Sequence, residues 1–372
     1  MLSIPYPTVH PPTRVLMGPG PSVMEPSVLD AMGRPTLGHL DPAFLEIMDE
    51  VRVMLRAVFR TDNDLTMPMS GTGSAGMETV LVNLIEPGDR VLVGICGVFG
   101  QRMAEVASRA GAEVVKVEGE WGRALDPDAL RKAGGGGLFK ALCLVHGETS
   151  TGVLQPMEEM RGIADELGAL LIMDCVTSLA GVRVEIDSWG VDAAYSGTQK
   201  CLSCPPGLAP ITLSSRAQDV LSRRKAKVAS WYLDLTLIGS YWGEERAYHH
   251  TAPINAIYGL HEALRVVLEE GLEQRWARHA ASSQHLYEGL GAQGLALRVP
   301  TEERLAPLTA VAVPDGVADA RVRAALLKDH DLEIGGGLGP MKDNTWRIGL
   351  MGAGATKTHA ELCLSGLRSV LG

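Results

Sequence analysis

Two residues with reactive side chains stand out because of the segments in which they lie. Lys200 ends the sequence YSGTQK (195–200) and precedes seven uncharged residues, 201–207. Asp174 closes the apolar run 169–173, which predicts a buried strand. A lysine kept away from water has a lowered pKa, so its free amine can act as a nucleophile or carry a proton. An aspartate at the carboxyl end of a strand lies where open α/β sheets bind ligands.

An amine and a carboxylate placed in this way suit the binding of pyridoxal 5′-phosphate. The lysine would bond to the aldehyde carbon of the cofactor. The aspartate would keep the ring nitrogen protonated, so that the ring can withdraw electrons from a bound substrate. Taken alone, each residue has a plainer interpretation, because most lysines are solvated and many aspartates only stabilise turns. The hypothesis therefore depends on other segments that complete such a site.

A glycine-rich segment, GTGSAG (71–76), opens a predicted helix at 77–85 and suits anion binding. Backbone N–H groups and the hydroxyls of Thr72 and Ser74 would meet at the positive end of the helix dipole. The spacing also matches a dinucleotide motif, but Pro68 interrupts the preceding strand and no acid is clearly placed about 20 residues later. We expect one phosphate group here. A plain tight turn and a nicotinamide-dependent oxidoreductase remain alternatives.

Further aromatic and polar residues follow predicted strands at the same edge of the sheet. Phe99 follows a strand and could stack on a planar ring, although core packing is the plainer interpretation. The segment HGETSTG (146–152) ends another strand with several polar side chains. Arg347 lies in an apolar strand, where an unpaired guanidinium is costly. It should meet either a substrate carboxylate or the partner of an internal salt bridge.

Three other patterns carry no chemistry in this interpretation. Cys201 and Cys204 have the spacing of a redox or zinc pair, but no second pair matches and proline follows at once. The rings of the adjacent His249 and His250 are expected to point apart, which argues against a metal site. The basic run 223–227 is most simply the solvated end of a helix.

Composition limits the class of protein. With 372 residues two domains are expected, and 46% hydrophobic and 21% charged residues are typical of soluble globular proteins. A net charge of −10 argues against a general nucleic-acid binder. No apolar run reaches the roughly 20 residues of a membrane span, and the N-terminus lacks signal-peptide features. Scattered cysteines fit a reducing compartment, so we expect a cytoplasmic protein that binds no membrane.

The order of the predicted elements indicates an α/β fold. The proline-rich residues 1–14 predict an extended arm that lies on a partner subunit. Between 15 and 255, helices alternate with continuous apolar strands, which predicts a sheet covered on both faces. Residues 256–372 predict a smaller α+β domain. Helices are predicted at 41–60, 77–85, 100–110, 126–132, 156–167, 256–270, 274–290, 318–330 and 357–371, and strands at 90–95, 112–117, 141–145, 170–174, 193–196, 209–213, 309–313, 332–335 and 345–350.

Taken together, these segments resemble the class V aminotransferases of fold type I, whose cofactor is pyridoxal phosphate. The chain is similar to the alanine–glyoxylate and serine–glyoxylate (serine–pyruvate) aminotransferases over nearly its whole length. The resemblance implies a large domain with a mixed, mostly parallel sheet between helices and a smaller C-terminal α+β domain. The motifs that carry it are GPGP (18–21), SGTG (70–73), EPGD (86–89), HGE (146–148), STGVLQP (150–156), YSGTQK (195–200), YHHT (248–251), GGGLGP (335–340) and RIGL (347–350).

The resemblance also implies roles for the residues that would handle chemistry and bind substrate. Lys200 would be the Schiff-base lysine and Asp174 the partner of the ring nitrogen. Arg347, together with Gly20, would bind the substrate, with the guanidinium on its α-carboxylate. Thr149 would lie beside the cofactor ring.

A second set of residues would hold the cofactor. Tyr248 and Thr251 would reach the phosphate of the other subunit's cofactor, which makes a homodimer part of the site. Phe99 stands at the stacking position, where tryptophan is usual, and the position of Ser74 is often histidine. The phosphate of the chain's own cofactor would be held by Thr72, Gly73, Ser74 and Gln199.

The expected reaction is a ping-pong transamination from a small amino acid, alanine or serine, to glyoxylate or pyruvate. The sequence offers one candidate arginine for a substrate carboxylate and no second, which favours small donors over aspartate or glutamate. The alternatives within the fold are a ureidoglycine–glyoxylate aminotransferase and a lyase such as a cysteine desulfurase. A catalytically silent scaffold is the weakest alternative.

Overall fold

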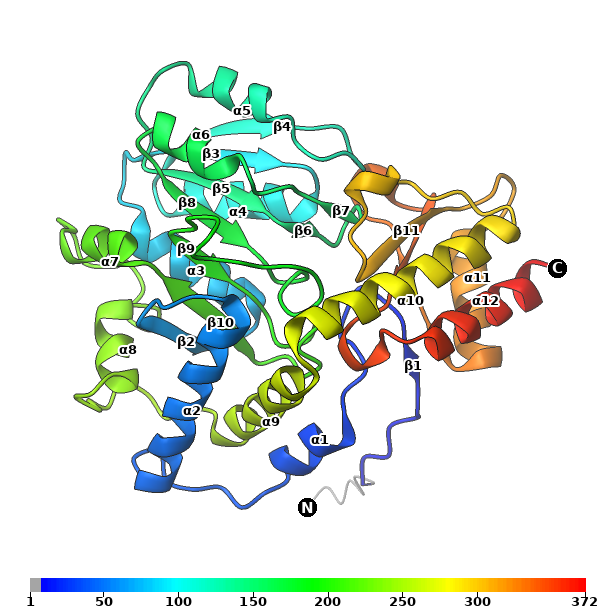
Figure 1. The fold of residues 1–372 in the computed structure, drawn as a ribbon, viewed down its shortest axis with the longest axis horizontal. Helices are drawn as coiled ribbons and strands as arrows, with labels where there is room; N and C mark the ends of the chain where they lie inside the picture. Colours follow the sequence, from blue (N-terminus) through cyan, green and yellow to red (C-terminus); the bar gives the residue numbers. More distant parts are fainter. Residues whose placement is uncertain (1–7) are drawn as a thin grey trace, which may run out of the picture.

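The computed structural model describes residues 8–372, so part of the predicted arm, 1–7, lies outside the described residues. A seven-stranded sheet forms the centre of the larger part of the chain (Figure 1). The five strands from β9 to β4 are parallel, whereas β10 is antiparallel to both neighbours. The predicted mixed, mostly parallel sheet is confirmed. Its order is β2 (Leu65–Ser70), β10 (Leu208–Leu213), β9 (Ala193–Tyr195), β8 (Leu170–Asp174), β5 (Ala141–Val145), β3 (Arg90–Ile95) and β4 (Glu113–Glu118).

Helices flank this sheet, and several begin at recognisable signals (Figure 1). Asp41 accepts a hydrogen bond from the N–H of Ala43 at the start of α2, and Pro42 occupies the first turn. The bounds are α1 (Pro26–Met32), α2 (Pro42–Phe59), α3 (Gly73–Leu84), α4 (Val98–Arg109), α5 (Pro127–Gly134), α6 (Met160–Glu166), α7 (Ser215–Ser222), α8 (Leu235–Trp242) and α9 (Ile254–Glu270). A small hairpin of β6 (Gly147–Glu148) and β7 (Val153–Leu154) follows β5.

Some of these elements were predicted too short or were not predicted, for identifiable reasons. Helix α3 begins at Gly73, four residues before the predicted start. Glycine usually weakens a helix, but Gly76 lies so close to β10 that a Cβ would come within 3.0 Å of Ala209. Pro68 was expected to interrupt the strand before the glycine-rich segment, yet β2 is an edge strand, where proline is tolerated. The short elements α1 and α8 were not predicted, and of α7 only its basic end was expected, at 223–227.

The C-terminal part forms a second group of elements around its own core (Figure 1). Strand β1 and Met17, near the N-terminus, also belong to this core, because β1 pairs in parallel with β12. The larger sheet has a separate core. The elements are α10 (Leu272–Ala292), β11 (Leu308–Ala312), α11 (Asp319–His330), β12 (Leu332–Glu333), β13 (Gly335–Gly336), β14 (Thr345–Gly349), α12 (Lys357–Leu371), β1 (Val15–Leu16) and the 3₁₀ turns Thr301–Glu303, Gly339–Met341 and Gly352–Gly354.

Among the helices described, none combines the length and the apolar character needed to cross a membrane. All six cysteine thiols are free and buried.

Candidate active site

A cavity of about 220 Å³ lies at the carboxyl edge of the large sheet. Asp174 ends β8, Lys200 follows β9, Phe99 lies in the first turn after β3, and Thr149 follows β6. Eight of the predicted site residues line this one cavity: Thr72, Gly73, Ser74, Phe99, Thr149, Asp174, Gln199 and Lys200. Parallel strands deliver their carboxyl ends to the same edge, which explains how residues so distant in the sequence meet.

Lys200 is buried, with 8% of its surface exposed. Burial lowers the pKa of its amine to about 8, and the nearby Arg347 guanidinium acts in the same direction. Its Nζ donates to the carbonyl of Pro19. Gly20, the next residue, has a φ of +102°, and a Cβ there would lie 2.8 Å from Nζ. The positive φ favours glycine at this position, and a larger residue would also push the amine aside.

Asp174 is also buried, and its Oδ1 accepts a hydrogen bond of 2.9 Å from the N–H of Val176. Burial raises the pKa of Asp174 to about 7, while the Val176 N–H and the nearby Tyr195 oppose this rise. The Tyr195 hydroxyl itself meets no hydrogen-bond partner in the described structure. A carboxyl group in this state becomes a carboxylate once a cation, such as a protonated ring nitrogen, is placed against it.

The start of α3 supplies the predicted anion cradle. The side chain of Thr72, at the N-cap, makes no capping hydrogen bond, so its hydroxyl stays available. A Cβ at Gly73 would come within 3.2 Å of Val176, which lines the cavity. The absence of a side chain at Gly73 therefore lets the start of α3 pack closely against the cavity wall. The buried Oε1 of Gln199 has no partner among the described groups. Unpaired first-turn N–H groups, a free hydroxyl and an orphaned amide fit a phosphorylated cofactor.

Arg102 lines the cavity and was missed in the sequence. Its Nη1 donates to the Ser74 hydroxyl at 3.3 Å, and its guanidinium lies 4.9 Å from the centre of the Phe99 ring. A signal was present, because Arg102 falls three residues after Phe99 at the start of a predicted helix, where such residues are neighbours. The cavity therefore has a cation beside Ser74, whereas the predicted substrate residues Arg347 and Gly20 are not among the residues that line it.

Arg347 is buried in β14 and makes two hydrogen bonds to carbonyl groups. Its Nη1 donates to Thr149 at 3.1 Å, and its Nε donates to Gly336 at 2.7 Å. No carboxylate among residues 8–372 forms a salt bridge with it. The internal salt bridge considered as an alternative is therefore absent from this part of the chain. Thr149 thus connects the guanidinium to the wall of the cavity.

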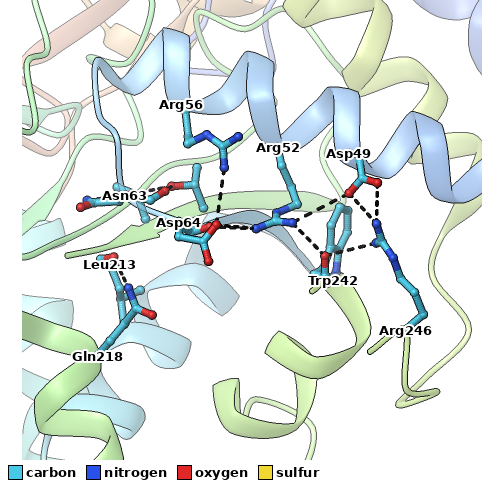
Figure 2. Close-up of polar contacts among 11 residues, drawn as sticks. Asp49, Arg52, Arg56, Asn63, Asp64, Leu213, Gln218, Trp242 and Arg246 are labelled. Carbon is cyan, nitrogen blue, oxygen red and sulfur yellow. Dashed lines mark hydrogen bonds and ion pairs between the residues drawn. The ribbon is translucent and has the colours of Figure 1, made fainter. Parts of the chain in front are cut away.

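Tyr248 and Thr251 are not among the residues that line the cavity of the same chain. Tyr248 is 60% exposed and lies on an irregular segment after α8. Figure 2 shows how the start of that segment is fastened to α2. Arg246 forms an ion pair with Asp49 of α2 at 2.5 Å. Arg52, also on α2, donates a hydrogen bond to the Trp242 carbonyl at 3.2 Å and forms an ion pair with Asp64 at 3.1 Å.

The prediction that His249 and His250 point apart was wrong. Their Nδ1 atoms lie 2.8 Å apart, because the segment is irregular and does not alternate like a strand. His249 Nε2 faces the Trp231 carbonyl at 3.2 Å, so this nitrogen carries a proton. In a neutral pair His250 Nδ1 then donates to His249, and the Ser70 hydroxyl donates to His250 Nε2 at 3.0 Å. The pair links the segment to the strand before the anion cradle.

The other sequence patterns are structural. Among the described residues no group of His, Cys, Asp or Glu has the arrangement of a metal site. Cys201 donates to the Thr177 carbonyl at 3.3 Å and is buried, as is Cys204. The basic run 223–227 follows the end of α7 and is largely exposed.

The fold is that of the fold type I pyridoxal-phosphate-dependent transferases, as the solved structures of two aminotransferases show. The chain matches the family model Aminotransferase class-V over residues 21–339 and belongs to that family.

Individual relatives are similar over almost the whole chain. An alanine–glyoxylate aminotransferase of Drosophila melanogaster is 42% identical over 97% of this chain and 93% of its own length. A (S)-ureidoglycine–glyoxylate transaminase of Bacillus subtilis is 40% identical over 97% of this chain and 91% of its own. The crystal structure of an alanine–glyoxylate aminotransferase from Nostoc sp. is 48% identical, has a TM-score of 0.98, and the match covers 99% of this chain and 98% of that one.

Proposed function

We propose that this aminotransferase uses pyridoxal phosphate to move the amino group of a small amino acid to glyoxylate or pyruvate. The observation that carries the proposal is that Lys200 and Asp174 open into one cavity, beside an anion cradle. When bound, the cofactor supplies a cationic ring that withdraws electrons from the substrate. Thr72, Gly73, Ser74 and Gln199 would hold its phosphate, and Phe99 and Thr149 would border its ring.

The chain's own residues account for substrate binding and proton movement. Arg347 binds the substrate α-carboxylate, because its charge is buried and has no internal carboxylate partner. Lys200 has a pKa of about 8, so its amine can accept the proton from the substrate Cα and deliver it to the cofactor. Asp174 would face the ring nitrogen of the bound cofactor and favour its protonated form. The 2-oxo acid leaves before the acceptor binds, which makes the reaction ping-pong.

The active unit in this proposal is a homodimer. Tyr248 and Thr251 are exposed in one chain, and the neighbouring Trp231 is 62% exposed. Exposed aromatic residues of this kind are typical of a protein interface. The partner's copies of Tyr248 and Thr251 would complete the phosphate site.

The relatives favour two amino donors, alanine and ureidoglycine, and serine is a third candidate. A desulfurase is disfavoured, because burial raises the pKa of Cys201 and Cys204 to about 12 and leaves neither thiol as a mobile nucleophile. The test is an assay of the purified protein with each donor and with glyoxylate or pyruvate as acceptor. Formation of glycine from glyoxylate with alanine, serine or ureidoglycine supports the proposal. Sulfide release from cysteine without amino transfer would refute it.

A further inference from the structure

Helix α4, which carries Phe99 into the cavity wall, begins without a side-chain cap of its own. Its N-cap residue is Gly97. The first N–H groups of a helix have no partner within the helix, so they need acceptors from elsewhere. Here a distant segment supplies them. The N–H of Phe99 donates to Glu148 Oε2 at 3.0 Å, that of Gly100 donates to the same oxygen at 3.2 Å, and that of Val98 donates to Ser150 Oγ at 2.9 Å.

The other oxygen of Glu148 is equally occupied. Oε1 accepts from the Ser150 N–H at 3.0 Å and from the Ser150 hydroxyl at 2.6 Å. The carboxyl group is fully buried and forms no salt bridge among residues 8–372. Each oxygen accepts two donors, which only the carboxylate form can do without losing one of them. Burial raises the pKa of Glu148, while these hydrogen bonds and the start of α4 favour its charged form.

The fit between the two segments is tight. A Cβ at Gly97 would collide with the side chains of both Ser150 and Glu148. The start of α4 therefore packs directly against Glu148 and Ser150, and its position depends on these two residues.

Glu148 also adjoins a second residue that lines the cavity. The next residue, Thr149, lines the cavity, and its carbonyl accepts the hydrogen bond from Arg347. The charge of Glu148 also favours the charged form of the buried Arg347, whose pKa is lowered by burial. One buried carboxylate is thus joined to the aromatic wall through backbone amides and to the arginine through its neighbour's carbonyl.

We propose that Glu148 is a positioning residue, which sets the position of Phe99 relative to Thr149 and, through the Thr149 carbonyl, relative to Arg347. Glu148 does not itself reach the cavity, so it acts through these three residues. This inference deepens the proposed function and depends on it for its catalytic consequence. We call the hydrogen bonds that join Glu148 and Ser150 to the start of α4 the clamp. The clamp can be tested without any cofactor.

The first test is Glu148→Gln, with Glu303→Gln as the matched control. Glu303 also accepts a backbone N–H, that of Ala124 at 2.7 Å, but lies outside the cavity. In Glu148→Gln an amide NH₂ must face a backbone donor, so the start of α4 loosens. We expect amide hydrogen exchange in a peptide spanning 97–101 of the cofactor-free protein to quicken about tenfold or more. The control should leave exchange in this peptide within twofold of the wild type.

The second test separates a positioning role from a merely structural one. Loaded Glu148→Gln should raise the KM for the amino donor and lower kcat, with a combined loss of about 10- to 100-fold in kcat/KM. The visible circular dichroism of the bound cofactor should change, because it reports the surroundings of the ring. A folded Glu148→Gln protein with wild-type exchange, KM, kcat and dichroism would overturn the proposal.

A third variant decides the question if Glu148→Gln does not fold. Ser150→Ala removes two of the clamp's hydrogen bonds and keeps the carboxylate, so it should shift the same quantities in the same direction by a smaller factor. Unchanged exchange and dichroism in folded Ser150→Ala would contradict the clamp. If instead the wild-type protein binds no pyridoxal phosphate and transfers no amino group, the proposed function fails, whereas the exchange result still judges the clamp.

Discussion

The two halves of the proposed site differ in how completely one chain forms them. Lys200, Asp174 and Thr149, which end or follow strands, are buried in the wall of the cavity, whereas Ser74 and Arg102 on the same wall are exposed. The segment with Tyr248 and Thr251 is irregular and exposed, and is held at its start by ion pairs to α2 (Figure 2). The difference indicates that the groups proposed to move protons are set by the core of one subunit. In the proposed homodimer, by contrast, part of the phosphate site would depend on assembly of the two subunits.

The largest expected effect is that of removing the amine from the enclosed half. Lys200→Ala should lower amino transfer by at least about 10³-fold, because the nucleophile and the proton carrier are lost together. The fold should survive, since Nζ contacts only a backbone carbonyl in the described structure. Lys225→Ala, in the exposed basic run, is the control. Retention of wild-type activity in Lys200→Ala would remove the proposal.

Asp174→Asn should have the next largest effect. The neutral amide cannot hold the ring nitrogen charged, and we expect kcat to fall about 100-fold. Steady-state kinetics with saturating donor measure the change. An unaltered kcat would show that the ring nitrogen has another partner.

The pH dependence of cofactor capture tests the environment of Lys200. Its pKa is lowered to about 8, so the amine is protonated and unreactive below that pH. The rate at which cofactor-free protein reacts with pyridoxal phosphate should rise about tenfold per pH unit up to about pH 8 and then level off. Stopped-flow absorbance measures this rate. A rate that rises steadily to pH 10 would indicate a solvated lysine.

Tyr248→Phe tests the exposed half. Loss of one hydrogen bond to the phosphate should weaken cofactor binding about tenfold. Subunit mixing shows whether the contact comes from the partner. At low cofactor concentration, mixing Lys200→Ala with Tyr248→Phe subunits should restore about one quarter of the sites, because half of the dimers carry one intact site. No restoration after confirmed subunit exchange would place Tyr248 in the site of its own chain, or in neither.

Arg102→Gln should have the smallest effect. Its guanidinium is exposed and makes one polar contact, to Ser74, so we expect cofactor binding to weaken about two- to threefold. Arg109→Gln, on the same helix and paired with Glu105, is the control and should bind normally. Equal affinities in the two variants would exclude Arg102 from the phosphate site.

Features that depend on local sequence patterns could be predicted, whereas features that depend on contacts between distant segments could not. The alternating elements and the Lys200–Asp174 pair were predictable, because apolar periodicity and strand-end position are local properties. The contact between His249 and His250 was not, since it depends on an irregular backbone. Arg102 had a local signal that was overlooked. The proposed role of Glu148 could not be predicted, because its hydrogen bonds join segments about 50 residues apart in the sequence.

The measurement that tests the central claim most directly is borohydride reduction of the protein after addition of pyridoxal phosphate, followed by peptide mass spectrometry. The account predicts one stable pyridoxyl adduct, on the peptide that contains Lys200, with loss of the yellow colour. An adduct confined to another lysine, or no adduct in a folded protein, would contradict the assignment of this cavity.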